Sequence, residues 1–353
     1  RAKKRYLSTR RKKPRPNTDI KAIFYITLRR NSAYGKVMKS KRNKTIDFNI
    51  QEGQRYLKNC ITADDTLTAE KIIDKTIVGD TFDVLKKLPR GIFDLMIADP
   101  PYNMDKRFDG EKFKKLSYDD YLNYTVSWLS AALPLLKRDA SVYVCCDWRS
   151  SGAISQALDK LLIVRNRITW QREKGRGCKK NWKNAMEDIW FCTVSDDYVF
   201  NLSDVKMRRR VIAPYRDKGA PKDWEQTPCG NFRDTCPSNF WDDISVPYWS
   251  MAENTSHPTQ KPEKLLAKLI LASSDAGDLV LDPFLGSGST SVTAKKLGRH
   301  YTGIEKSPLY CAWAEKRLED AKWDKTIQGY NDGVFWERNT APRANKIKKS
   351  ENK

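Results

Sequence analysis

The residues Asp99, Pro100, Pro101 and Tyr102 directly follow an apolar run at positions 93–98. A carboxylate accepts hydrogen bonds from an amino group, and the rigid prolines fix the direction of the backbone carbonyls. A tyrosine ring offers a face on which a planar ring can stack. These residue types therefore indicate a pocket that holds a flat ring and takes protons from it, with an ordinary turn as the alternative.

A glycine-rich loop lies between a predicted strand and a predicted helix in the second half of the chain. Gly286 and Gly288 permit a sharp turn and the close approach of a ligand. The dinucleotide fingerprint needs a third glycine where this chain has Ser291, and the phosphate-loop pattern Gly-Lys-Ser/Thr is absent. Glu305 ends the next predicted strand, where an acid can bind a ribose diol. The pattern indicates a nucleoside site without a pyrophosphate, with a tight turn before an ordinary helix as the alternative.

Both motifs need a scaffold that brings the ends of strands together. Apolar runs of strand length alternate with apolar residues at helical spacing, which indicates an α/β fold with a largely parallel sheet. The strands are predicted at 76–80, 93–99, 140–146, 166–171, 187–194, 278–282 and 301–305. The helices are predicted at 118–137, after Pro262, at 289–298 and at 308–322. Residues 22–28 are a further candidate strand, whereas 30–70 show no clear pattern.

The net charge of +22 is concentrated at the two ends of the chain. Residues 1–58 hold 19 Lys and Arg against 3 acids, and residues 342–353 hold 5 against 1, which leaves +2 for the 283 residues between them. Basic ends suit a polyanion such as a nucleic acid. A disordered solubilising segment is the alternative for residues 1–20.

The composition argues against several other classes of protein. No apolar run reaches the roughly 18 residues that a membrane span needs. No secretory signal is visible, although the start at Arg1 leaves a processed N-terminus open. The 8 Cys lack the spacing of a zinc site, and with only 2 His no metal site is expected. Reduced, buried thiols fit a cytosolic protein.

Three motifs occur in an informative order: DPPY at 99–102, HPTQKP at 257–262 and DPFLGSGST at 282–290. Together they resemble the amino-methyltransferases of DNA that use S-adenosylmethionine, and their order resembles the beta class, over about residues 76–325. In that family DPPY is usual for adenine-N6 enzymes and SPPY for cytosine-N4 enzymes. The resemblance implies N6 methylation of a flipped-out adenine. It also implies a Rossmann-like class I methyltransferase fold with helices on both faces of a mostly parallel sheet.

The resemblance implies roles for the residues of the first motif. Asp99 and the backbone carbonyl of Pro100 would accept the two amino hydrogens of the base, so that the nitrogen becomes nucleophilic. Pro101 would help to fix the loop, and Tyr102 would stack on the base. Placement of the amino nitrogen then supplies much of the catalysis.

The resemblance likewise implies a set of residues for the cofactor, S-adenosylmethionine. They are Asp80, Asp99, His257, Thr259, Gln260, Lys261, Asp282, Phe284, Gly286, Gly288, Ser289, Thr290 and Glu305. Asp80 would lie beside the cofactor's adenine and Glu305 would bind the ribose hydroxyls. Residues 259–261 would hold the methionine end, because a helix N-terminus and a lysine suit a carboxylate.

Residues 172–256 carry Gly, Pro, Trp and basic residues with little periodicity, and they lie where this family keeps its target-recognition region. The chain is therefore expected to comprise five parts. They are a basic, partly disordered extension (1–75), a catalytic half (76–171), a loop-rich target-recognition insert (172–256), a cofactor-binding half (257–325) and a basic tail (326–353).

Two basic runs lie in this region, between the catalytic and the cofactor motifs. Residues 165–183 hold eight Lys and Arg, and residues 206–222 hold seven, each against one acid. Arginine reads guanine edges and both cations neutralise phosphate, with a solvated face as the alternative. The candidate DNA-binding residues are Arg172, Lys174, Arg176, Lys179, Lys180, Arg208, Arg209 and Arg210.

The expected partner is double-stranded DNA, and the expected setting is the cytoplasm of a bacterium, with a bacterial or phage origin. A cognate restriction endonuclease, and the choice between monomer and homodimer, stay open. A cytosine-N4 or RNA-modifying enzyme of the same fold is one alternative. A non-catalytic module that binds cofactor and nucleic acid is another, and the intact Asp99 and Tyr102 argue against it. A dinucleotide oxidoreductase is disfavoured by the incomplete glycine pattern.

Overall fold

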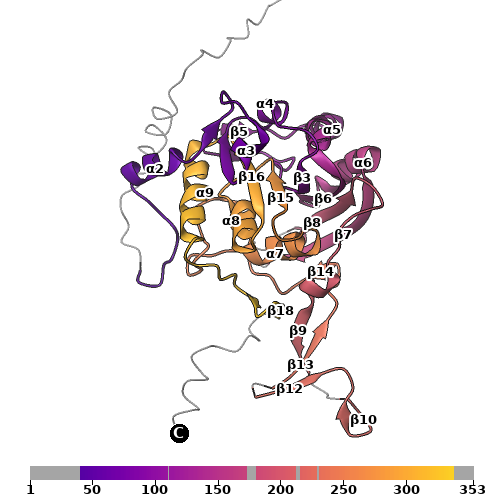
Figure 1. The fold of residues 1–353 in the computed structure, drawn as a ribbon. Coiled ribbons are helices and arrows are strands. Elements are labelled where there is room, and N and C mark those ends of the chain that lie inside the picture. The colour runs from indigo at the N-terminus through magenta and orange to yellow at the C-terminus, as the bar shows by residue number, and fades with distance from the viewer. Residues whose placement is uncertain (1–39, 110, 173–179, 212–214, 229, 338–353) are drawn as a thin grey trace, which may run out of the picture.

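The computed structural model describes residues 40–109, 111–172, 180–211, 215–228 and 230–337 (Figure 1). Its centre is a nine-stranded sheet in the order β1-β2-β16-β15-β3-β6-β8-β7-β14. Strand β8 runs antiparallel to its two neighbours, and the other neighbouring strands are parallel. The bounds are β1 Ile61–Thr62, β2 Lys75–Val78, β3 Phe93–Ala98, β6 Leu136–Cys146, β7 Ile163–Gln171, β8 Met186–Thr193, β14 Phe240–Trp241, β15 Leu279–Asp282 and β16 His300–Glu305. The expected α/β class with a mostly parallel sheet is confirmed.

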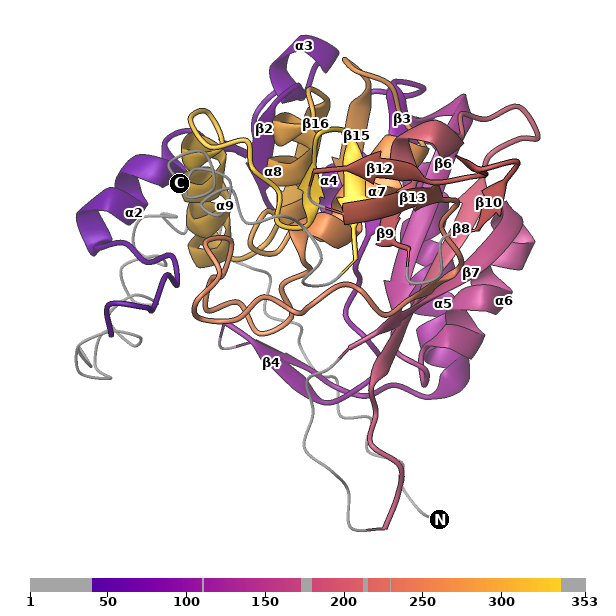
Figure 2. The same cartoon turned by 90° about the horizontal axis from the view of Figure 1, so that it is seen from below.

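Helices cover both faces of this sheet. One face carries α4 (Thr81–Leu85), α5 (Tyr118–Ala132) and α6 (Ser151–Leu161), and the other carries α7 (Glu263–Ala272), α8 (Ser289–Lys296) and α9 (Pro308–Asp320). Helices α5 and α6 lie side by side (Figure 2). Each face of the sheet has its own apolar core, and alternate residues of β3 point into the two cores. Met96 faces the core under α4, α5 and α6, whereas Leu95 and Ile97 face the core under α7, α8 and α9. Burial on both faces explains why residues 95–98 of this strand form a continuous apolar run.

The predicted strands between residues 76 and 305 are present, with shifted ends. Strand β6 begins at Leu136 rather than at residue 140. The helix before it stops at Ala132 and a 3-10 turn, Leu133–Leu135, follows. Pro134 accounts for this stop, because proline has no amide hydrogen and cannot continue a helix. Helix α6 was not predicted, although its apolar residues have helical spacing.

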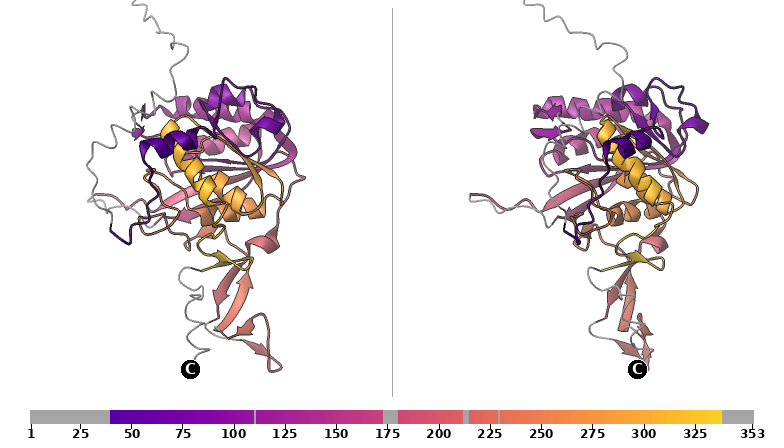
Figure 3. Two further views of the ribbon diagram at one scale, coloured as in Figure 1. Left: turned by 60° about the vertical axis from the view of Figure 1, so that its left-hand side comes forward. Right: turned by 90° about the vertical axis from the view of Figure 1, so that its left-hand side faces the viewer.

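The structure divides the predicted insert 172–256. Strands β8 and β14 fall inside this segment but belong to the central sheet. Three of its other strands, β9, β12 and β13, form a second sheet with β17 and β18 in the order β12-β13-β9-β18-β17, which stands away from the body (Figures 1 and 3). Its bounds are β9 Met207–Arg210, β12 Glu225–Thr227, β13 Gly230–Thr235, β17 Tyr330–Asn331 and β18 Val334–Trp336. A hairpin of β10 (Arg216–Asp217) and β11 (Ala220–Pro221) lies beside it. We call the five-stranded unit the projecting sheet.

The projecting sheet combines two distant parts of the chain. Strand β18 comes from the predicted tail 326–353 and pairs in parallel with β9, with Phe335 opposite Met207. The Lys264 ammonium at the start of α7 donates a hydrogen bond of 2.6 Å to the carbonyl of Trp336 and bonds to Asp243. The buried lysine therefore ties the projecting sheet to the body.

Part of the predicted extension 1–75 belongs to the folded body. Helix α2 (Ile50–Leu57) begins with a capping box of Asn49 and Glu52 and packs against α9. Strand β1 joins the central sheet, and α3 (Ala69–Ile72) leads into β2. The candidate strand at 22–28 lies outside the described residues. None of the helices in the described part of the chain is long and apolar enough to cross a membrane.

Candidate functional site

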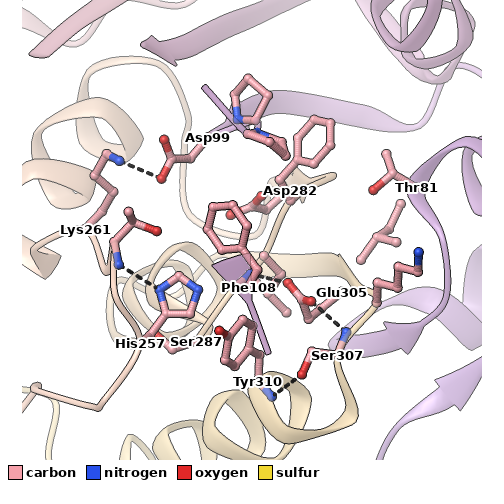
Figure 4. Close-up of a pocket in the computed structure, with 18 of the residues that line it drawn as sticks. Thr81, Asp99, Phe108, His257, Lys261, Asp282, Ser287, Glu305, Ser307 and Tyr310 are labelled. Atoms are coloured by element: carbon pink, nitrogen blue, oxygen red, sulfur yellow. Dashed lines mark hydrogen bonds and ion pairs between the residues drawn. The ribbon is translucent and has the colours of Figure 1, made fainter. Parts of the chain in front are cut away.

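A cavity of about 570 Å³ opens where the carboxyl ends of β2, β3, β15 and β16 meet (Figure 4). This edge is where parallel sheets bind ligands. The two sequence motifs reach it because Val280 of β15 pairs with Leu95 of β3, which aligns the two strand ends. The predicted residues that line the cavity are Asp80, Asp99, Pro100, Pro101, Tyr102, His257, Thr259, Gln260, Lys261, Asp282, Phe284, Gly286, Ser289, Thr290 and Glu305.

The first motif is held in place by hydrogen bonds from two helices of one face. The Tyr121 hydroxyl on α5 donates to the carbonyl of Pro101 at 2.9 Å. The amide of Asn103 donates to the Ser150 hydroxyl at the start of α6, also at 2.9 Å. These contacts fix the loop so that Asp99 faces the cavity (Figure 4).

Both carboxylate oxygens of Asp99 have partners. Oδ1 accepts a hydrogen bond of 2.8 Å from the Tyr102 hydroxyl, and Oδ2 accepts one of 2.5 Å from the Lys261 ammonium. Lys261 is only 7% exposed. Nearby acids, Asp99 and Glu187, raise the pKa of its ammonium against the effect of burial. Lys261 was expected to face a ligand carboxylate; in the structure its partner is Asp99.

Two acids end neighbouring strands of the sheet: Asp282, which is buried, ends β15, and Glu305, which is half-buried, ends β16. Glu305 accepts hydrogen bonds from the amides of Gly286 (2.9 Å) and Ser307 (2.7 Å). Asp282 accepts one from the amide of Phe284 at 2.9 Å. Burial raises the pKa of Glu305 and that of Asp282 to about 7 each. The two acids therefore titrate near neutral pH.

The two glycines of the loop have different roles. Gly286 has φ +56°, and a Cβ added to it would lie 3.1 Å from the ring of His257. Gly288 has φ +84°, and its added Cβ would lie 2.6 Å from the Cβ of Ala314 on α9. Gly288 was expected to line the cofactor site but is not among the cavity residues. Only glycine lets the backbone at 288 pack this closely on α9.

The segment 257–261 also shows a division of roles. The Gln260 side chain accepts from the amide of Thr255 and donates to the carbonyl of Glu253, so it fixes its own loop. The ring of His257 packs edge-on against Tyr310 at 4.5 Å between centroids. Burial lowers the pKa of His257 to about 3, so this imidazole is neutral.

Several cavity residues were not predicted. Strands β4 (Lys106–Phe108) and β5 (Glu111–Phe113) form a hairpin, and Phe108 of this hairpin lines the cavity with Tyr310. The Ser307 hydroxyl donates to Asp109 at 2.5 Å, which joins the hairpin to the end of β16. The aromatic and polar residues that follow DPPY in the sequence could have indicated that this segment also lines the cavity.

The DNA-binding candidates have diverse surroundings. Arg172 is ion-paired with Glu187 beside Tyr102. Arg208 forms two hydrogen bonds with Asp234, and Arg209 pairs with Glu337 at 3.2 Å. Lys180 and Arg210 are exposed, whereas Lys174, Arg176 and Lys179 lie outside the described residues.

In the described ranges, no group of three or more His, Cys, Asp and Glu could hold a metal ion.

Known proteins resemble this chain over the region that builds the cavity. A family model described as DNA methylase matches residues 93–316. DNA adenine methyltransferase YhdJ of Escherichia coli (strain K12) is 35% identical over 258 residues, covering 70% of this chain and 83% of that protein. Type II methyltransferase M.HpaI of Haemophilus parainfluenzae is 32% identical, covering 69% and 74%. The solved PvuII DNA methyltransferase (cytosine-N4-specific) is 16% identical with a TM-score of 0.51, covering 70% of this chain and 90% of its own.

Proposed function

Because the chain belongs to the DNA methylase family and shares the fold of a solved DNA methyltransferase, we propose that it methylates the exocyclic N6 of adenine in double-stranded DNA. S-adenosylmethionine is the proposed methyl donor. The observation that carries this proposal is the placement of Asp99 and Tyr102 on the same cavity as the acids Glu305 and Asp282. A planar base and a nucleoside cofactor can thus occupy one site.

The cavity suits this cofactor on physical grounds. Five acids line it, namely Asp80, Asp99, Asp109, Asp282 and Glu305, against the three lysines Lys106, Lys261 and Lys306, and this excess of acids favours a cationic ligand. Glu305 is held by two backbone amides, so its carboxylate is oriented as an acceptor for ribose hydroxyls. When bound, S-adenosylmethionine supplies an electrophilic methyl group on a cationic sulfur.

The residues of this chain prepare the base for that methyl group. The lone pair of an adenine amino nitrogen is delocalised into the ring, which makes it a poor nucleophile. Asp99 and the carbonyl of Pro100 accept its two hydrogens and so localise the lone pair. Tyr102 stacks on the base, and the cavity excludes water. The target base must leave the duplex to reach this site.

Adenine is proposed over cytosine because the motif begins with Asp99 rather than serine. The adenine methyltransferase similar to this chain supports the choice. The test is methylation of unmethylated bacterial genomic DNA with labelled cofactor, followed by nucleoside mass spectrometry and mapping of the site. We expect N6-methyladenine at one sequence. N4-methylcytosine as the main product, or methylation of RNA alone, would contradict the proposal.

We further propose that the projecting sheet contributes to target recognition. It carries the basic residues Arg208, Arg209 and Arg210 on β9 and stands away from the body (Figure 3). Phosphate and base contacts of such a unit would fix the register of the duplex over the cavity. A bacterial cytoplasmic setting and a cognate nuclease are part of the proposal. Cytosine-N4 methylation and RNA methylation are outcomes of the same test.

A further inference from the structure

We infer that Glu187 is a positioning residue that takes over Lys261 from Asp99 while the amino group of the target base is bound. The inference rests on the proposed function, because it concerns how Asp99 becomes available to that amino group. Glu187 lies on the antiparallel strand β8, opposite Trp170 of β7, and does not line the cavity.

The contacts of Glu187 place it directly behind the catalytic motif. Its carboxylate is 3% exposed. Oε1 is ion-paired with Arg172. Oε2 lies 3.2 Å from the Tyr102 hydroxyl and 3.4 Å from the Lys261 ammonium. Lys261 therefore lies between two carboxylates, with Asp99 the nearer at 2.5 Å.

This arrangement creates a conflict for the proposed reaction. Each oxygen of Asp99 already has one partner, Tyr102 or Lys261, and the positive charge of Lys261 at 2.5 Å makes Asp99 a weaker acceptor for the amino hydrogen of the base. Lys261 cannot move into water, because its side chain is buried. A buried ammonium left without an ionised partner would carry a large desolvation penalty.

Glu187 resolves the conflict without a large movement. A small rotation of the Lys261 side chain exchanges Asp99 for Oε2 of Glu187, so the ammonium keeps an ionised partner throughout. Arg172 holds the other oxygen of Glu187 and thereby keeps its carboxylate in place. Oδ2 of Asp99 is then open to the base. The role requires the charge of Glu187 and not only its shape.

The test measures single-turnover methyl transfer at saturating cofactor, on plasmid DNA that carries the mapped target sequence. In Glu187→Gln the neutral amide cannot replace Asp99 as the partner of the ammonium. We expect the rate to fall about 10- to 100-fold, with cofactor affinity changed less than about threefold. A rate within about threefold of the wild type would overturn the inference.

A second variant separates this role from simple support of the fold. Removal of the ammonium in Glu187→Gln/Lys261→Met frees Asp99, so the double variant should be at least about fivefold faster than Glu187→Gln alone. A residue with only a structural role would give a double variant that is slower still, and that result would contradict the inference. Glu187→Asp keeps the charge and should retain more than about a third of the wild-type rate even if the glutamine variant fails to fold. A slower aspartate variant would speak against the inference.

The control is Asp94→Asn. Asp94 is a half-buried acid that pairs with Lys137 at 2.6 Å and accepts a hydrogen bond from the amide of Leu279, but it does not line the cavity. Its substitution should lower the free energy of unfolding and leave the transfer rate unchanged, whereas an equal fall in rate would refute a specific role for Glu187. If the wild type forms N4-methylcytosine, the proposed function fails. The rates of the variants relative to the wild type still decide the inference, because a cytosine amino group also needs Asp99 as acceptor. A wild-type chain that methylates no base would overturn both.

Discussion

Asp99 is the residue on which methyl transfer should depend most. It lies at the carboxyl end of β3, and its carboxylate accepts the amino hydrogen in the proposed reaction. We expect Asp99→Ala to lower the transfer rate more than about tenfold, a loss above ~1.4 kcal/mol of barrier stabilisation, while cofactor binding persists. The control is Asp94→Asn at the other end of the same strand, where Asp94 pairs with Lys137. Near-normal transfer by Asp99→Ala would contradict the assignment.

Glu305 should make cofactor binding depend on pH. Its pKa of about 7 in the free protein means that it is largely protonated at pH 6 and ionised at pH 8. If the cationic cofactor prefers the ionised form, affinity should rise about tenfold from pH 6 to pH 8 and level off above that. Calorimetry on the wild type and Glu305→Gln checks this, because the variant should lose much of the dependence. A pH-independent wild type would refute it.

The same shift has a consequence for stability. The pKa of Glu305 in the folded chain lies above the ordinary value, so the folded state holds a proton that the unfolded chain releases. The free energy of unfolding of the cofactor-free protein should therefore fall as pH rises from about 4.5 to about 7 through this group. Asp282, shifted in the same direction by burial, adds to the effect.

At the scale of elements, the packing of α8 on α9 depends on Gly288. A Cβ at this position would lie 2.6 Å from the Cβ of Ala314, and the positive φ adds backbone strain. We expect Gly288→Ala to lower the free energy of unfolding by roughly 1–3 kcal/mol, with cofactor affinity per folded molecule nearly unchanged. Gly286→Val is the contrasting variant, which should mainly weaken cofactor binding because its side chain meets His257. Denaturant titration and calorimetry distinguish the two.

The projecting sheet should depend on its last strands. A chain that ends at residue 329 lacks β17 and β18, so the pairing partner of β9 on that side is lost. We expect DNA affinity to fall at least about tenfold while cofactor affinity changes little. The control is a chain that ends at residue 337, which loses residues 338–353 but keeps β18. Equal loss in both chains would assign the effect to the basic tail instead of the strand.

Sequence patterns predicted the elements whose apolar periodicity is local. Strand β3 and helix α5 are examples, because β3 is a short apolar run buried on both faces of the sheet and α5 packs its apolar residues against one face. The motifs DPPY and HPTQKP, together with the acid that ends the predicted strand 301–305, led us to expect Asp99, Lys261 and Glu305 in one cofactor site, and all three line the same cavity. The role of Glu187 could not be predicted, because its partners are distant in the sequence. Tyr102 lies 85 residues before Glu187, and Lys261 lies in a separate motif after it. Likewise, nothing local to residues 334–336 indicates that they pair with β9.

At the scale of the whole molecule, most of the net positive charge lies near the two ends of the chain. Residues 1–39 hold 14 Lys and Arg against one acid, and α2 packs on α9 just after them. A deletion should therefore begin the chain at residue 40, which keeps α2. If about five of the removed cations contact phosphates, the slope of log affinity against log salt should flatten by roughly 4 units.

The methylated sequence should stay the same in that shortened chain, because phosphate contacts carry no direct sequence information. A salt titration of DNA binding and mapping of the product measure the two quantities. An unchanged slope would exclude these residues as phosphate contacts, whereas a changed target sequence would show that they read bases.

The pairing of β18 with β9 has a consequence for synthesis on the ribosome. The N-terminal part of a chain leaves the ribosome first and domains fold as they emerge. The residues that line the cavity are all synthesised before β18. A ribosome that stalls after α9 thus releases a chain with a complete cavity and an unfinished projecting sheet. If that sheet reads the target as proposed, such a fragment binds cofactor but finds no sequence. Incomplete translation then yields an idle protein rather than an indiscriminate methylase.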